Sequence, residues 1–125
     1  MNIAIIIIPH AEQRYPTVGD WFFLGDDLQI RVSKLSDWRY EMLVARHELD
    51  EAILCEHEGI TQKVVDDFDE KFEAARTAND DSEPGDSPLA PYRRPHFRAT
   101  TNERIMADAL GVNWQEYEAE LNSMP

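Results

Sequence analysis

The sequence predicts an α+β fold in which a small, mostly antiparallel sheet of about three strands packs on a long central helix, with three further helices. The stretch up to residue 33 holds short segments rich in β-branched and aromatic residues, separated by proline and glycine. Beyond it, apolar residues recur at helical spacing between capping residues. A chain of 125 residues has the size of one domain, so we expect a single domain over residues 1–125.

The predicted strands are Ile3–Ile8, Trp21–Leu24 and Leu28–Ser33. The first is apolar throughout and mostly β-branched, which is typical of a strand buried on both faces or covered by helices. The third alternates apolar and polar residues, as a half-buried strand does. Residues 25–27 supply a turn between the last two strands, so these should form a hairpin with which the first strand pairs.

The central helix is predicted from a cap at Ser36 or Asp37 to about Glu58, with Gly59 as its stop. Its apolar residues form two stripes, which are Met42, Ala45, Leu49, Ala52 and Ile53, and Leu43, Val44, Leu54 and Cys55. A helix that is apolar over so wide an arc is expected at the centre of the fold.

Three shorter helices follow. Thr61 is the expected cap of the first, whose core face comprises Val65, Phe68 and Phe72. Because the turn from the central helix is short, we expect these two helices to pack antiparallel. Thr100–Glu103 has the pattern of a capping box and predicts the next helix, which Gly111 ends, and Asn113 caps a short last helix. Residues 77–91 are polar, acidic and rich in helix breakers, which predicts a mobile loop.

Composition excludes several classes of partner and site. The net charge of −13 argues against direct binding to a nucleic-acid backbone. The single cysteine, Cys55, excludes an intramolecular disulfide and any site of three or four thiolates within one chain, and it suits a reducing compartment. Ile3–Ile8 is too short to span a bilayer and lacks the basic start of a signal peptide, so no membrane partner is expected. A homo-oligomer is compatible with the sequence.

The most specific chemical signal is the segment His47–Glu51 on the central helix. His47 and Glu51 are four residues apart and share a helical face, where an imidazole and a carboxylate can hold one metal ion. Asp69, the acid of its helix expected to point inward, and His96 are the candidates for the remaining ligands. Zinc is the first expectation, and manganese or iron also suits a mixed nitrogen and carboxylate set.

The order His-Glu-x-x-Glu is similar to the His-Glu-x-x-His helix motif of zincin peptidases and departs from it at Glu51. The similarity implies a metal-dependent hydrolase of a small-molecule or peptide ligand, with Glu48 as general base for a water that the metal activates. In the alternative interpretation, His47 and Glu51 pair only with each other or reach solvent, and Asp69 binds an arginine.

A second group of residues indicates a non-catalytic binder of a small anionic ligand such as a nucleotide. Side chains that hydrogen-bond, stack or carry positive charge occur in the loop after the first strand and in a basic cluster at 93–98. These residues are His10, Gln13, Arg14, Tyr15, Trp21, Arg93, Arg94 and Arg98. The loop side chains could instead satisfy their own backbone, and the arginines could neutralise nearby acids. A third interpretation, an acidic DNA mimic, rests on the net charge and the acids at 80–86.

The chain resembles a family of small proteins encoded by tailed bacteriophages and prophages. The resemblance covers nearly the whole chain, through Pro9-His10-x-Glu12-Gln13-Arg14-Tyr15-Pro16-Thr17-Val18-Gly19-Asp20-Trp21, His47-Glu48-Leu49-x-Glu51-Ala52, Phe68-Asp69, Ala90-Pro91-Tyr92 and His96. It implies a viral origin and a location in the host cytoplasm, and it specifies no reaction. Under this resemblance, the ligand binder would be an accessory protein that counters a host defence.

Overall fold

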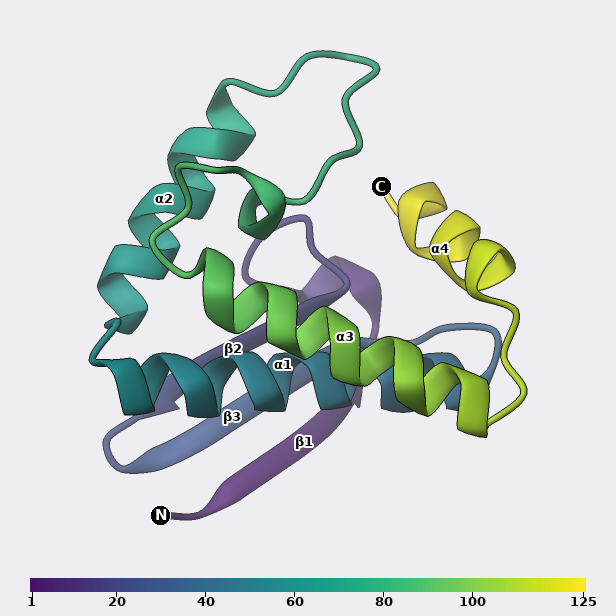
Figure 1. The fold of residues 1–125 in the computed structure, drawn as a ribbon, viewed down its shortest axis with the longest axis horizontal. Coiled ribbons are helices and arrows are strands. Elements are labelled where there is room, and N and C mark those ends of the chain that lie inside the picture. The colour runs from purple at the N-terminus through teal and green to yellow at the C-terminus, as the bar shows by residue number, and fades with distance from the viewer.

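The computed structural model describes all 125 residues and confirms the α+β class. Three strands form one sheet, namely β1 (Ile3–Ile8), β2 (Gly19–Leu24) and β3 (Asp27–Ser33). The helices, labelled in Figure 1, are α1 (Trp38–Glu58), α2 (Gln62–Ala74), α3 (Arg93–Ala109) and α4 (Trp114–Ser123). Two short 3-10 helices lie in the loops, η1 (His10–Glu12) and η2 (Pro84–Asp86).

The sheet is mixed, with the strand order β1-β3-β2. Strands β2 and β3 form the predicted antiparallel hairpin. Strand β1 pairs with β3 in parallel, with Ile3 opposite Leu28 and Ile8 opposite Ser33. The sheet is therefore less antiparallel than expected, because residues 9–18 carry the chain past β3 and begin β2 on its far side.

Strand β1 is an edge strand and is not buried on both faces, so that prediction was wrong. Ile3, Ile5 and Ile6 each keep between 44% and 49% of their surface exposed, while Ile7 packs against the core. The reason is the position of α1, which contacts β2 and β3 and leaves the outer strand beyond its reach.

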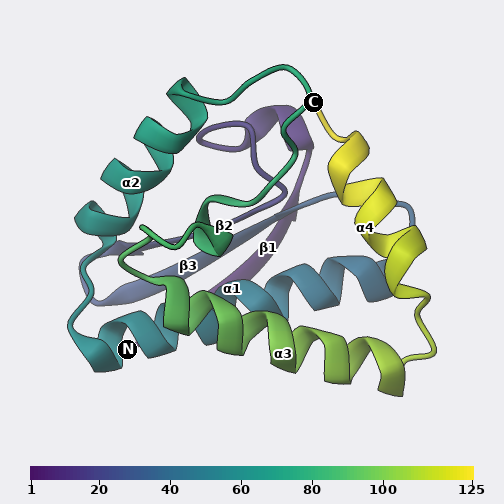
Figure 2. The ribbon, with the colours of Figure 1, turned by 45° about the horizontal axis from the view of Figure 1, so that its top comes forward.

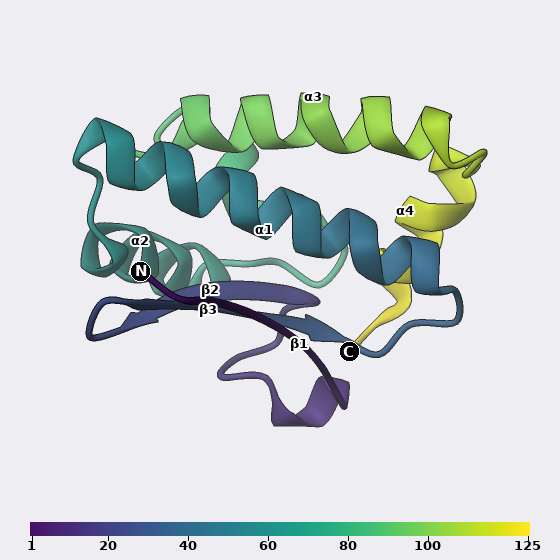
Figure 3. The same cartoon turned by 90° about the horizontal axis from the view of Figure 1, so that it is seen from below.

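Helix α1 is the middle of three layers, with the sheet on one side and α3 on the other (Figure 3). Leu28, Ile30 and Val32 of β3 belong to the same buried cluster as Leu43 and Val44 of α1. Burial from two sides accounts for the wide apolar arc of the central helix. Two members of the predicted stripes, Met42 and Ile53, are nevertheless exposed, because they fall between the two contact faces.

Helix α2 does not fold back along α1 as an antiparallel partner, which corrects the sequence prediction. It extends away from the C-terminal end of α1. Helix α4 follows the C-terminal end of α3, on the other side of the molecule (Figures 1 and 2). As predicted, Gly59 ends α1, with its φ of 72° in the left-handed region, and Thr61 caps the start of α2. The two faces of α1 are already covered by the sheet and α3, so α2 packs Phe68 against Tyr92.

Helix α3 begins at Arg93, well before the predicted capping box at Thr100–Glu103. Pro95 lies in its first turn, where a missing backbone N–H costs no hydrogen bond. The earlier start places His96 and Glu103 on one helix and buries both of them. Glu103 is therefore an interior residue and not a cap. No helix of the protein has the length and apolar character needed to cross a membrane.

Candidate metal centre

Three buried side chains from α1 and α3 bring their donor atoms to one point. Nε2 of His47 lies 3.3 Å from Oε2 of Glu51 and 3.3 Å from Nδ1 of His96, and that oxygen lies 2.9 Å from Nδ1. Each residue keeps between 5% and 8% of its surface exposed. A triangle of this size can place one ion at about 2.0–2.1 Å from every corner, the length of a zinc–ligand bond.

Glu103 orients the ring of His47. Nδ1 of His47 donates a hydrogen bond to Oε1 of Glu103 at 2.7 Å, and the hydroxyl of Tyr117 donates to the other carboxylate oxygen. Because Nδ1 carries its proton toward Glu103, the lone pair of the neutral ring is on Nε2, which faces Glu51 and His96. Carboxylate–histidine pairs of this kind fix the ligand tautomer in metal sites.

Trp21 orients the carboxylate of Glu51. The indole Nε1 donates a hydrogen bond to Oε1 at 3.1 Å, and Oε2 is left to face the two histidines. Trp21 lies on β2, so the sheet fixes a side chain of α1 that would otherwise rotate. Trp21 is buried and lines the cavity beside the three donors, and its indole N–H is already used by Glu51.

The second ring nitrogen of His96 faces the loop before α3. Nε2 lies 2.9 Å from Oε2 of Glu83 and 3.2 Å from Oδ1 of Asp86. Neither oxygen lies in line with the ring N–H, and this buried nitrogen forms no hydrogen bond. Gly85 of the same loop packs on the ring face, where an added Cβ would lie 2.4 Å from Cγ of His96.

The charges around the three donors favour a positive charge at their meeting point. Burial by itself lowers the pKa of His47 and His96, but the carboxylates of Glu51, Glu103 and Glu83 outweigh it and raise both values. Burial by itself raises the pKa of Glu51, and the two histidines outweigh it and lower that value. Protons or a metal cation can supply this positive charge, so the two compete and metal affinity should rise with pH.

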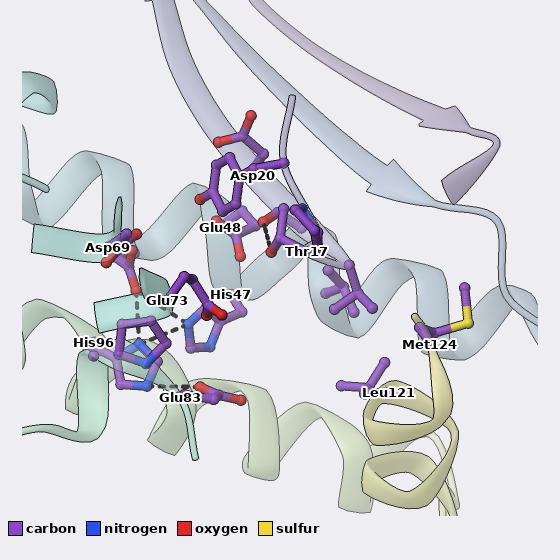
Figure 4. A pocket seen from close by; sticks show the side chains of 18 of the residues that line it. Thr17, Asp20, His47, Glu48, Asp69, Glu73, Glu83, His96, Leu121 and Met124 are labelled. Carbon is purple, nitrogen blue, oxygen red and sulfur yellow. Dashed lines mark hydrogen bonds and ion pairs between the residues drawn. The ribbon is translucent and has the colours of Figure 1, made fainter. Parts of the chain in front are cut away.

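A cavity of about 230 Å³ adjoins the three donors. It extends from His47, Glu51 and His96, which we call the triad, between the loop before β2, helix α2 and helix α4. Its wall includes Tyr15, Thr17, Asp20, Glu48, Asp69, Glu73 and Leu121. Figure 4 shows the carboxylate of Glu48 between Asp20 and His47 at this cavity. The site is therefore reachable from outside on the side where Glu48 lies.

Glu48 is half-buried, and its environment suits a proton acceptor. Burial, together with the negative charge of Glu51, raises the pKa of Glu48 well above its ordinary value. Gly19 of β2 leaves room for this side chain, since a Cβ at that position would lie 2.7 Å from Oε1 of Glu48 and 2.6 Å from Val44. A backbone without a side chain is thus required beside Glu48.

Asp69 lies in the wall of the cavity, outside the group of three donors. Its Oδ1 accepts a hydrogen bond from the hydroxyl of Tyr92. Burial raises the pKa of Asp69 to about 7, the hydrogen bond from Tyr92 opposes the shift, and the charge of Glu51 adds to it. The structure thus brings together three of the four residues predicted as metal ligands.

The residues predicted to bind an anionic ligand do not meet. His10, Tyr15 and Trp21 line the cavity beside the triad. The three arginines predicted to bind the anion lie early in α3, are exposed and share a separate depression with Leu54 and Glu58. They are Arg93, Arg94 and Arg98. One small anion cannot contact both groups.

Three polar residues between β1 and β2 hold this segment in place through contacts with the rest of the protein. Gln13 donates to the backbone oxygens of Val18 and Arg31 and to Oγ of Ser33. Arg14 pairs with Asp20 at 2.6 Å and lies 3.5 Å from Asp66. His10 contacts Ser33 and donates to the backbone oxygen of Pro125. Of these contacts, only the hydrogen bond from Gln13 to Val18 satisfies the loop's own backbone, and the others tie the loop to the sheet, to α2 and to the C-terminus.

Sequence reasoning missed the residues that position the donors. They are Glu83, Gly85, Asp86, Glu103 and Tyr117. One signal was available, because His96, Ala99, Glu103 and Ala107 share a helical face, and all four are buried. The loop residues gave no such signal, since their placement depends on tertiary contacts.

Searches against protein-family models, curated proteins and solved structures find no match for this chain. The chemistry of the centre is accordingly inferred from the residues that form it.

Proposed function

We propose that this protein is a metal-dependent hydrolase whose metal is held by His47, Glu51 and His96. The supporting observation is the convergence of three buried donor atoms from two helices. Glu103 and Trp21 further hold two of these donors by hydrogen bonds. Two histidines and one glutamate are a donor set of catalytic zinc sites, so zinc is the expected ion. Manganese and iron also accept mixed nitrogen and carboxylate ligands.

Three protein ligands leave a coordination position for water or substrate, and the adjoining cavity gives access to it. A bound zinc ion would act as a Lewis acid and lower the pKa of a water toward about 7. Glu48 would take the proton of the attacking water and return it to the leaving group. Burial raises the pKa of Glu48, which makes its carboxylate a stronger base for this transfer.

The wall of the cavity indicates the charge of the substrate. Asp20, Glu48, Asp69 and Glu73 contribute carboxyl groups. A neutral or cationic small molecule or peptide segment fits this lining better than an anionic nucleotide does. The resemblance to phage proteins supports a role as an accessory protein in the host cytoplasm.

The test of the metal site is elemental analysis of protein purified without a histidine tag. After exhaustive dialysis, we expect the wild type to retain roughly one tightly bound zinc per chain and His47→Gln to have lost that zinc. His57→Gln is the matched control, because His57 is exposed near the end of the same helix. This variant should keep the metal.

Thermal unfolding with increasing chelator separates a ligand from a packed histidine. As the metal is removed, the wild type should fall toward the Tm of His47→Gln, because the free energy of metal binding is lost. His57→Gln should follow the wild type. A difference between wild type and His47→Gln that stays constant at every chelator concentration would exclude the metal site.

A further inference from the structure

His96 offers a second nitrogen that the catalytic centre does not use. Nδ1 belongs to the triad, whereas Nε2 points to the opposite side of the ring, toward the loop before α3 (Figure 4). His96 keeps 5% of its surface exposed, and Nε2 has no hydrogen-bond partner. Carboxylate oxygens lie near it, but none is aligned for a hydrogen bond, and a buried nitrogen without that bond costs free energy that a ligand would recover.

Two carboxylates meet this nitrogen. Oε2 of Glu83 and Oδ1 of Asp86 lie 2.9 and 3.2 Å from Nε2, and the three atoms lie within 4.8 Å of one another. Neither oxygen is aligned with the axis along which Nε2 carries its proton or, after that proton is lost, its lone pair. One nitrogen and two carboxylate oxygens suit a divalent transition metal such as zinc or manganese.

The loop geometry holds both acids on the same side. Glu83 immediately precedes the 3-10 helix η2, and Asp86 is its last residue, three positions later. The backbone N–H of Asp86 donates to the carbonyl oxygen of Glu83 at 3.1 Å, and this turn brings the two residues close together. Gly85 between them lies against the imidazole, so the loop cannot shift away from the ring without opening a gap.

We propose that Glu83, Asp86 and Nε2 of His96 form a second divalent-cation site. When both sites are filled, Nε2 gives up its proton to solvent, and the resulting imidazolate bridges the two ions. The side chains of Glu83 and Asp86 are 57% and 64% exposed, so an ion reaches this site from solvent without any opening of the core. Greater exposure also makes the second site weaker and faster to exchange than the buried triad. The inference rests on the proposed function only in sharing His96 with its metal site.

The experiment is a calorimetric titration of the full, untagged, chelator-stripped chain with zinc chloride, repeated with manganese chloride. Wild type is expected to bind two zinc ions, the second more weakly. Glu83→Gln combined with Asp86→Asn should remove the weaker event and leave the tighter one. The control is Glu56→Gln combined with Glu118→Gln, which removes the same charge from two exposed positions and should bind like wild type.

One outcome would overturn the second site even if the double variant has an effect. If wild type binds a single ion and the double variant binds that ion about 10–100-fold more weakly, then Glu83 and Asp86 only orient His96. Retention of both events by the double variant would overturn it as well. The Tm of each chelator-stripped variant shows that the chain is folded in every comparison.

His47→Gln separates this inference from the proposed function. It removes a ligand of the triad but leaves Glu83, Asp86 and Nε2 in place, so it should lose the tight event and keep the weak one. If the catalytic site does not exist, wild type and His47→Gln will show the same single weak event, which the double variant loses. If only the tight event exists, the second site is refuted and the proposed function stands.

Discussion

Oε1 of Glu103 accepts a hydrogen bond from Nδ1 of His47 at 2.7 Å, across 56 residues of sequence and between two packed helices. The contact fixes which nitrogen of His47 faces the interior. Tyr117 of α4 donates to the other oxygen of Glu103, so a third helix holds the same carboxylate. The donor geometry therefore depends on the packing of α1, α3 and α4 together.

The variant Glu103→Gln tests this dependence. Glutamine keeps the shape of the side chain but loses the charge, and its amide can present either a donor or an acceptor to Nδ1. Zinc affinity should fall about 10–100-fold, as it does when a partner of a metal-bound histidine is changed. Competition with a chromophoric chelator measures the change.

Tyr117→Phe is the matched variant, because it removes one hydroxyl and leaves Glu103 charged. Its zinc affinity should fall less than that of Glu103→Gln. Equal zinc affinity in wild type and Glu103→Gln would show that the carboxylate does not orient the ligand.

Glu48→Gln separates catalysis from metal binding. The variant should keep its zinc, because Glu48 is not one of the three converging donors. Its hydrolytic rate should fall about 10²–10⁴-fold, the usual effect of losing a general base. The rate is measured on substrates selected from a panel of esters, peptides and phosphoesters with the wild type.

Stability gives Glu48→Gln a second readout. An uncharged amide replaces a carboxylate that burial disfavours, so the Tm should stay equal to that of the wild type or rise. The control is Glu58→Gln, at an exposed position of the same helix, which should leave rate and Tm unchanged. Full hydrolysis by metal-loaded Glu48→Gln would remove Glu48 from the mechanism.

Local signals predicted the parts of the centre that lie on one helix. His47 and Glu51 are one turn apart on α1, and the caps at Asp37 and Gly59 mark both ends of that helix. The start of α3 was harder to predict, since its N-cap residue Tyr92 makes no side-chain capping hydrogen bond. The capping-box pattern therefore placed Glu103 at a helix end, although it lies in the interior.

The sheet illustrates a different limit of sequence reasoning. A run of isoleucines fits a central strand and an apolar edge strand equally well, because it contains no alternation that would identify a solvent face. The position of α1 over β2 and β3 decides between them, and that position depends on tertiary packing. The predicted hairpin was confirmed, because its turn and its two strands are adjacent in sequence and their pairing follows from local signals.

Asp69→Asn should change how stability depends on pH. The folded pKa of Asp69 is about 7, above the unfolded value near 3.9, so the folded state binds the proton more tightly. Its contribution to stability is therefore greatest below about pH 4 and is lost as the pH rises through about 7. Asparagine cannot ionise and can still accept the hydrogen bond from Tyr92.

The measurement is the Tm of chelator-stripped Asp69→Asn minus that of wild type, from pH 4 to pH 8. We expect this difference to become more positive across the range, because only the wild type acquires the buried charge. Asp26→Asn, at an exposed turn position, should give a flat difference. A flat difference for Asp69→Asn would show that Asp69 ionises in the folded protein as it does in the unfolded chain.

Gly85→Ala tests whether the loop before α3 holds His96 in place. The added Cβ would lie 2.4 Å from Cγ and 2.5 Å from Nδ1 of the imidazole, so the ring or the loop has to move. The strain should lower stability by about 1–3 kcal/mol in the chelator-stripped protein, as overpacking does. Displacement of Nδ1 should also weaken zinc binding, which titration of the same protein measures.

Pro84→Ala changes the same turn without adding an atom beside the ring, so it should retain more zinc affinity than Gly85→Ala. Wild-type stability and zinc affinity in Gly85→Ala would mean that the loop does not press on His96.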